Sequence, residues 1–214
     1  MFMPKETGGG DFTPCPAGNH VAICIQVIDL GTQETNYMGE IDHKRQVRIG
    51  WELPEERMSD GRPFVIGKTY TFSSHKKAGL RLHLESWRGV AFKETDFGPG
   101  GFDIKNILGK PCLLNVMQKE KQTGGFYATV TGVSKLPKGM TVPAVSNGQI
   151  YFTLEKFDAH AFAALGDYWR EQIAKSPEYA SAVAPTKSSG APMSKITGSP
   201  IVGDLNDDIP FAAA

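Results

Sequence analysis

Few residues of this sequence have the spacing that catalysis requires. The five histidines show neither the His-x-x-x-His spacing nor the Cys/His clustering of a metal site. The glycine-rich runs at 8–10 and 98–101 lack the Lys-Ser/Thr of a phosphate-binding loop, and no Gly-x-Ser-x-Gly motif occurs. The best acid–base set is Asp103, Glu120 and Lys121, which a metal-dependent nuclease could use, although acids near a lysine are common by chance. We therefore expect no catalysis, no metal and no cofactor.

The chain ends in an acidic phrase with an apolar tip. Its members are Asp204, Asp207, Asp208, Ile209, Pro210 and Phe211. A segment rich in Ser, Pro, Gly and Ala precedes it, and such a flexible linker would hold the short tip away from any core. Two interpretations stay open. The segment is a short peptide motif that binds a partner with a basic, partly apolar groove, or it is an acidic terminus that only favours solubility.

Basic and aromatic side chains elsewhere fit the binding of single-stranded nucleic acid. Such binding needs a basic groove for phosphates and exposed rings on which bases stack. Lys44 and Arg48 lie on the polar side of an alternating segment, and Tyr127 alternates opposite apolar positions. Trp51 and Trp87 are in phase with apolar residues, so we expect both rings in the core. The candidate DNA-contacting set is Lys44, Arg48, Lys76, Lys77, Arg88, Lys119, Lys121, Tyr70, Phe72 and Tyr127.

The overall charge is not that of a strong nucleic-acid binder. The formal net charge is zero. Residues 183–214 hold two lysines and three aspartates, so 21 bases and 20 acids remain in the rest of the chain. Residues 41–88, however, hold ten Lys or Arg against six Asp or Glu, a local excess of four positive charges. Any basic surface must therefore come from local distribution.

Cysteine usage and hydropathy indicate a protein of a reducing compartment. Cys15, Cys24 and Cys112 are widely spaced, with no Cys-x-x-Cys pair, which argues against a disulfide framework or a zinc site. Cys24 and Cys112 lie in apolar runs and are expected to be small core residues. No stretch resembles a signal peptide or approaches the length of a membrane span. We expect a cytoplasmic protein with no membrane partner.

Apolar periodicity predicts a mainly β body. The expected elements are strands at 20–30, 43–53 and 64–74, a helix at 76–87, and a hairpin of strands at 111–119 and 126–136. Three strands, a helix and two strands are the order of the OB-fold, a five-stranded Greek-key barrel that binds oligonucleotides on its strand 2–3 face and in its 1–2 and 4–5 loops. A five-stranded β-meander or a small sandwich is the alternative.

The chain is expected to divide into four parts. These are a loose arm at 1–18, the OB-fold at 19–155, a helix at 156–180, and a disordered linker with the acidic tail at 181–214. Within 148–154 an extra strand is expected. Asp158 suits the helix N-cap, and Phe162, Leu165, Trp169 and Ile173 recur at helical spacing. We expect this helix to pack on the barrel or on a second copy, which leaves a homo-oligomer open.

Two parts of the sequence resemble known families. The terminal phrase resembles the acidic tip of bacterial single-stranded-DNA-binding proteins, an Asp-rich run that ends in Ile-Pro-Phe, although here three alanines follow Phe211. Over about residues 18–180 the chain resembles a group of bacteriophage single-stranded-DNA-binding proteins. The segments that carry this second resemblance are Trp51-Glu52-Leu53, Gly61-Arg62-Pro63-Phe64, Tyr70-Thr71, Glu85-Ser86-Trp87-Arg88-Gly89 and Ile107-Leu108-Gly109-Lys110-Pro111-Cys112.

These resemblances imply an OB-fold protein of phage replication, recombination and repair, working in the cytoplasm of an infected bacterial cell. It would coat single-stranded DNA without sequence preference. Its tail would recruit replication or repair proteins such as a polymerase, helicase, primase or nuclease. The alternative is a replication adaptor that binds proteins through an OB-like barrel and has no affinity for DNA.

Overall fold

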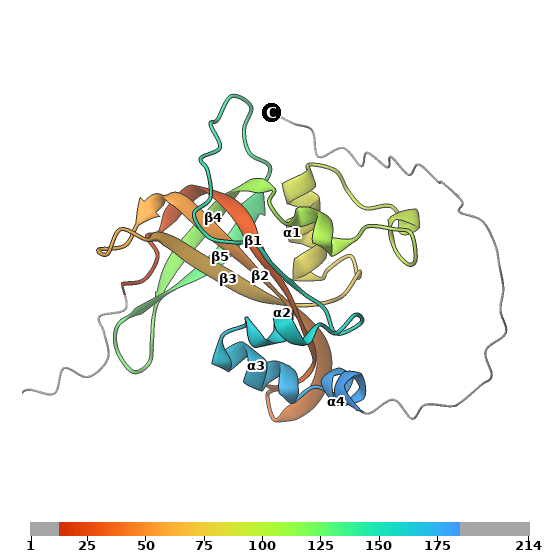
Figure 1. Cartoon of the computed structure of the whole chain (residues 1–214). Helices are drawn as coiled ribbons and strands as arrows, with labels where there is room; N and C mark the ends of the chain where they lie inside the picture. The colour runs from red at the N-terminus through yellow and green to blue at the C-terminus, as the bar shows by residue number, and fades with distance from the viewer. Residues whose placement is uncertain (1–12, 185–214) are drawn as a thin grey trace, which may run out of the picture.

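The computed structural model describes residues 13–184 and shows a mainly β protein (Figure 1). Its strands are β1 (Gly18–Tyr37), β2 (Glu40–Arg57), β3 (Pro63–Thr71), β4 (Pro111–Glu120), β5 (Phe126–Ser134) and β6 (Ile150–Phe152). Its helices are α1 (Gly79–Arg88), α2 (Ala159–Ala163), α3 (Asp167–Ala174) and α4 (Pro177–Val183), with 3-10 turns η1 (Glu94–Asp96) and η2 (Ile104–Ile107) between α1 and β4. The structure thus confirms the helix between the third and fourth strands, the later hairpin and the extra strand.

The strands form one six-stranded sheet in the order β3-β2-β1-β4-β5, with β6 parallel to β1 and every other pairing antiparallel. The sheet curves so that its edge strands β3 and β5 come into contact. The Lys68 Nζ donates a hydrogen bond of 2.7 Å to the Val130 carbonyl across this seam. Helix α1 contacts β3 and β5 beside the seam, so one helix covers the approach of the two edges.

The β1–β2 hairpin is longer than the sequence predicts. Residues expected to form a polar loop after Leu30 continue β1 as far as Tyr37, and the turn lies at Met38 and Gly39, both with positive φ. Apolar alternation ends near Leu30, but the backbone ladder to β2 continues to the turn. Residues 32–36 of this arm are polar and either half-buried or exposed, so the arm has no apolar alternation, which is why the loop prediction was wrong.

A main core fills the curved sheet. Trp51 and Trp87 meet in it with ring centroids 6.2 Å apart. Its other large members include Val47, Ile49, Leu53, Leu114, Val116 and Val130. Cys24 and Cys112 are fully buried there, as predicted, and Cys15 joins them. Burial raises the pKa of the Cys24 thiol to about 12, so this thiol stays protonated at neutral pH.

A second core lies where the C-terminal helices pack on β1 and β6. Its buried members are Ile28, Leu30, Phe152, Leu154, Leu165 and Ile173. The single helix predicted for 156–180 is instead three short helices. Asp158 caps α2 as predicted, by accepting from the backbone N–H groups of His160 and Ala161. Gly166 is the N-cap of α3. Ser176 is the N-cap of α4 and Pro177 is its first residue, a position that proline favours because it needs no backbone N–H there.

The three C-terminal helices gather beside the far part of the β1–β2 hairpin, away from α1 (Figure 1). Among residues 13–184, none of the helices has the length and hydrophobicity needed to cross a membrane.

Candidate nucleic-acid interface

The outer face of β2 and β3, on the side away from the main core, has two glycines at its middle. Gly50 and Gly67 are cross-strand partners there. A Cβ on Gly67 would lie 2.4 Å from a terminal nitrogen of Arg48, and a Cβ on Gly50 would lie 2.7 Å from the side-chain oxygen of Gln26. The glycines therefore let the side chains of Arg48 and Gln26 lie flat against the sheet.

Arg48 is held on this face, but it is partly covered. Its guanidinium lies over the Trp169 ring of α3 at 4.1 Å, with Gly67 beneath it. Its Nε is buried and has no hydrogen-bond partner among the described residues. Burial lowers the pKa of Arg48, but an arginine stays charged at neutral pH after such a shift. The predicted phosphate contact is thus a cation stacked on an indole rather than a freely exposed one.

Lys44 lies farther along β2, on the exposed arm of the hairpin. Its Nζ is 3.0 Å from a carboxylate oxygen of Asp42. Both side chains are exposed, so this pair is weak and a phosphate could displace the carboxylate. Lys44 therefore stays available to a ligand, at a distance along β2 from Arg48.

The β4–β5 hairpin brings a predicted cation and a predicted ring together. Lys119 and Tyr127 are direct register partners, and the Tyr127 side chain is 40% exposed. Lys121 lies exposed in the turn that follows β4. Lys68 of β3 lies across the seam, where its Nζ donates to the Val130 carbonyl of β5. Burial lowers the pKa of Lys68, and the charge of Lys119 lowers it further. We call Lys68, Lys119, Lys121 and Tyr127 the hairpin group.

Two of the predicted DNA contacts are wrong in their placement. Tyr70 is only 5% exposed, and its hydroxyl lies 2.8 Å from the His83 Nδ1, so its ring cannot receive a base. It is in phase with Phe64 and Ile66, and that phase buries it. Arg88 lies over the Phe92 ring at 4.2 Å and 3.8 Å from Asp96, where it ties α1 to the segment before β4.

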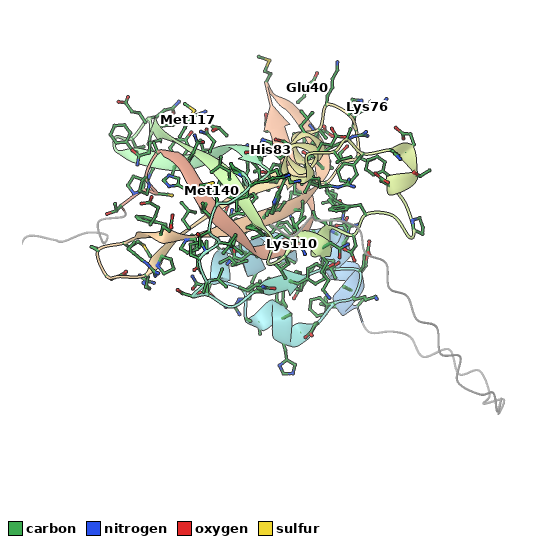
Figure 2. All side chains as sticks on the ribbon, turned by 90° about the horizontal axis from the view of Figure 1, so that it is seen from above. Glu40, Lys76, His83, Lys110, Met117 and Met140 are labelled. Carbon is green, nitrogen blue, oxygen red and sulfur yellow. The ribbon has the colours of Figure 1, made fainter. Side chains whose placement is uncertain are left out.

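Phe72, Lys76 and Lys77 form a separate group between β3 and α1. Phe72 is 46% exposed, with the Arg45 guanidinium 5.9 Å from its ring centre. Both lysines are exposed. Lys76 and Met117 of β4 lie well apart in Figure 2, so these lysines do not join the hairpin group.

Phe72 lines a cleft of about 740 Å³ between the end of β3, the segment before β4 and β6. Its charged groups have partners in the protein. Arg45 pairs with Asp29 at 2.7 Å, and Arg81 pairs with Glu85 at 2.8 Å while donating to the carbonyls of Ser74 and Phe92. These contacts indicate that the ions in the cleft brace the loops around it.

The acid–base set of the nuclease alternative is not assembled. Asp103 accepts from the backbone N–H of Lys105 and caps η2. Glu120 ends β4 on the hairpin, and Figure 1 shows the hairpin turn and the segment of η1 and η2 on opposite sides of the molecule. Within residues 13–184, no three His, Cys, Asp or Glu side chains gather in the manner of a metal site.

The acidic phrase at 204–211 lies outside the described residues. No protein-family model matches the chain, and no curated protein matches it significantly.

Proposed function

We propose that this protein binds single-stranded DNA without sequence preference. The observation that carries the proposal is the register pair of Lys119 and Tyr127, an exposed ring beside a cation on the β4–β5 hairpin. Bases stack on such rings irrespective of sequence, while neighbouring lysines attract the phosphates. The strand order, with α1 between β3 and β4, supports an OB-fold, in which this hairpin borders the strand 2–3 face.

In this proposal the strand would run from the hairpin group across the outer face of β2 and β3 to Arg48. The glycine pair lets the side chains of Arg48 and Gln26 lie flat against the sheet at the middle of this face. The acidic tail would recruit replication, recombination or repair enzymes, and the protein would act in a phage-infected bacterial cell. It would perform no chemistry on the DNA.

The test is a fluorescence-anisotropy titration of a labelled mixed-sequence single strand and of its duplex at two salt concentrations. We expect tighter binding of the single strand, weakened by salt. Tyr127→Ala should weaken single-strand binding about tenfold, since one stacked base contributes roughly 1–3 kcal/mol. Lys119→Ala should reduce the salt slope by about 0.7.

Two variants serve as controls for these effects. Tyr127→Phe keeps the ring and should bind like the unmodified protein. Lys138→Ala removes an exposed lysine from the segment between β5 and β6 and should leave both affinity and salt slope unchanged. Equal affinity for single strand and duplex, or no binding at low salt, would reject the proposal.

One observation favours the second candidate function, a protein-binding adaptor without DNA affinity. Five of the ten Lys and Arg side chains in residues 41–88 form ion pairs with acids of the same chain. The pairs are Lys44–Asp42, Arg45–Asp29, Arg62–Asp60, Arg81–Glu85 and Arg88–Asp96. An adaptor predicts no salt-dependent affinity for the labelled single strand, so the same titration separates the two functions.

A further inference from the structure

Helix α3 presents an aromatic ring that neither core uses. Tyr168 is 61% exposed, and its ring meets the Trp169 ring nearly at right angles, with centroids 4.8 Å apart. The large exposed area of a tyrosine ring costs free energy unless the ring has a partner, and a planar ring is the usual stacking surface for a base. Asp167, the acid beside Tyr168, is paired with Arg170 and repels a phosphate less than a free carboxylate would.

Trp169 fixes this ring on the outer face of β2. The indole packs against the second core and also receives the Arg48 guanidinium at 4.1 Å. Gly67 lies beneath the guanidinium, so Arg48 is held between the sheet and the indole. Because the indole contacts both the second core and Arg48, Trp169 is an anchored part of the surface.

Arg48 has hydrogen-bonding capacity that the described part of the protein does not use. No hydrogen bond or ion pair of the Arg48 side chain occurs among residues 13–184, and its Nε is buried without a partner. An arginine that stacks on a ring still presents its N–H groups in its own plane, where a phosphate oxygen can accept them. The Arg48 guanidinium and the exposed Tyr168 ring thus both contact Trp169, so this surface combines a cation with an exposed ring, as the hairpin does with Lys119 and Tyr127.

We propose that Tyr168, supported by Trp169 and Arg48, is a second base-stacking site for single-stranded nucleic acid. A base stacks on the Tyr168 ring, and the adjoining phosphate takes hydrogen bonds from Arg48. The C-terminal helical segment is then part of the binding face. This inference rests on the proposed function and deepens it, since it extends the path of the strand from the β4–β5 hairpin to α3.

The test uses the full chain and a labelled thymidine 20-mer, with affinity measured by anisotropy. Tyr168→Ala should weaken binding about tenfold, and Tyr168→Phe, which keeps the ring, should stay within about twofold of the unmodified protein. Leu82→Ala, at an exposed apolar position on α1, is the matched control and should bind normally. Thermal midpoints of all variants check that each is folded.

Tryptophan fluorescence gives an independent signal from the site. The chain has three tryptophans, and Trp51 and Trp87 are buried in the main core, so Trp169 is the one within reach of DNA. We expect the thymidine 20-mer to quench the emission and Trp169→Phe to remove that quenching. Quenching that persists in Trp169→Phe would overturn the inference.

The failures of the two proposals are distinguishable. If Tyr127→Ala weakens binding while Tyr168→Ala binds as tightly as the unmodified protein, the inference fails and the proposed function stands. Tighter binding by Tyr168→Ala would also overturn it, because α3 would then obstruct the face and not extend it. If the unmodified protein binds no single strand at low salt, both proposals fall together.

Discussion

The main core and the second core are assembled in different ways. In the main core, β2 alone supplies Val47, Ile49, Trp51 and Leu53 at alternate positions. The neighbouring strands, which are hydrogen-bonded to β2 along the backbone, add their own inward-facing residues. The second core takes Ile28 and Leu30 from β1. Its remaining buried members come from much later in the chain: Phe152 from β6, Ile173 from α3, and Leu154 and Leu165 from the segments on either side of α2. One core is built by sheet periodicity, the other by the docking of a distant segment.

Side-chain hydrogen bonds fasten that docked segment. The Glu178 carboxylate accepts from the Thr32 backbone N–H at 2.8 Å and from its hydroxyl at 2.6 Å. The Gln33 side-chain amide donates to the Gln172 carbonyl at 3.0 Å. The contact of Arg48 with Trp169 joins the sheet to α3. The position of α3 over the sheet therefore depends on the second core, the less extensively hydrogen-bonded of the two. Truncations in the two cores should therefore differ in how much of the structure they destabilise.

The largest effect is expected in the main core. Leu53 is fully buried there, and Leu53→Ala should lower the free energy of unfolding by about 3 kcal/mol through lost burial and the cavity that remains. Urea titration followed by circular dichroism measures it. The exposed Leu82→Ala should change the free energy of unfolding by less than about 0.5 kcal/mol. A similar loss in both variants would mean that burial in this core does not decide stability.

A truncation in the second core should act locally. Ile173 is fully buried, and Ile173→Ala should lower the free energy of opening of residues 159–183 by about 2 kcal/mol. Native-state hydrogen exchange should show faster exchange of those amides, with the unfolding of the sheet shifted by less than about 1 kcal/mol. If Ile173→Ala destabilises the sheet as much as Leu53→Ala does, the two cores unfold as one unit and the contrast between them is lost.

The same contrast explains how much of the fold could be predicted. Alternation along β2 and the helical phase of Leu84 and Trp87 predicted the main core, since the apolar periodicity of each element indicates which of its own residues face inward. The C-terminal region was predicted as one helix because Leu165, Trp169 and Ile173 share a helical phase across Gly166. Periodicity cannot show that the chain turns at that glycine, because the two sides of the turn pack on different strands, α2 on β6 and α3 on β1.

The candidate site was predictable only where it depends on one strand. Tyr127 follows from the polar side of β5, but its pairing with Lys119 depends on the register of the hairpin. Lys68 was missed because it shares a face with apolar residues, and its place in the hairpin group depends on the approach of β3 to β5. The contact of Arg48 with Trp169 joins two elements far apart in the chain, and no local pattern reports it.

A smaller effect is expected from the hydrogen bonds that dock α4. Glu178→Ala removes the acceptor of both Thr32 bonds and should lower the free energy of opening of residues 159–183 by about 1 kcal/mol. Hydrogen exchange measures this opening, as for Ile173→Ala. Glu171→Ala, at an exposed acid on α3, is the matched control and should leave exchange unchanged. Equal exchange in the two variants would show that the two Thr32 bonds do not contribute to docking.

The smallest effect is a pH dependence that belongs to the main core. Burial lowers the pKa of His83 below its ordinary value of 6.5, and the charge of Lys68 lowers it further. The unfolded chain therefore takes up a proton near pH 6.5, whereas the folded protein does so only at lower pH. The contribution of His83 to stability is present above about pH 6.5 and is lost as the pH falls through the folded pKa.

The variant that isolates this contribution is His83→Gln, which keeps a partner for the Tyr70 hydroxyl and cannot titrate. Its free energy of unfolding should fall less steeply below pH 6.5 than that of the unmodified protein. NMR titration of the His83 ring protons locates the folded pKa directly, and a midpoint at or above 6.5 would contradict the prediction. Because the group lies between β3 and α1, the loss should appear in the unfolding of the sheet and leave the opening of residues 159–183 unaffected, which separates the two cores by pH as well as by truncation.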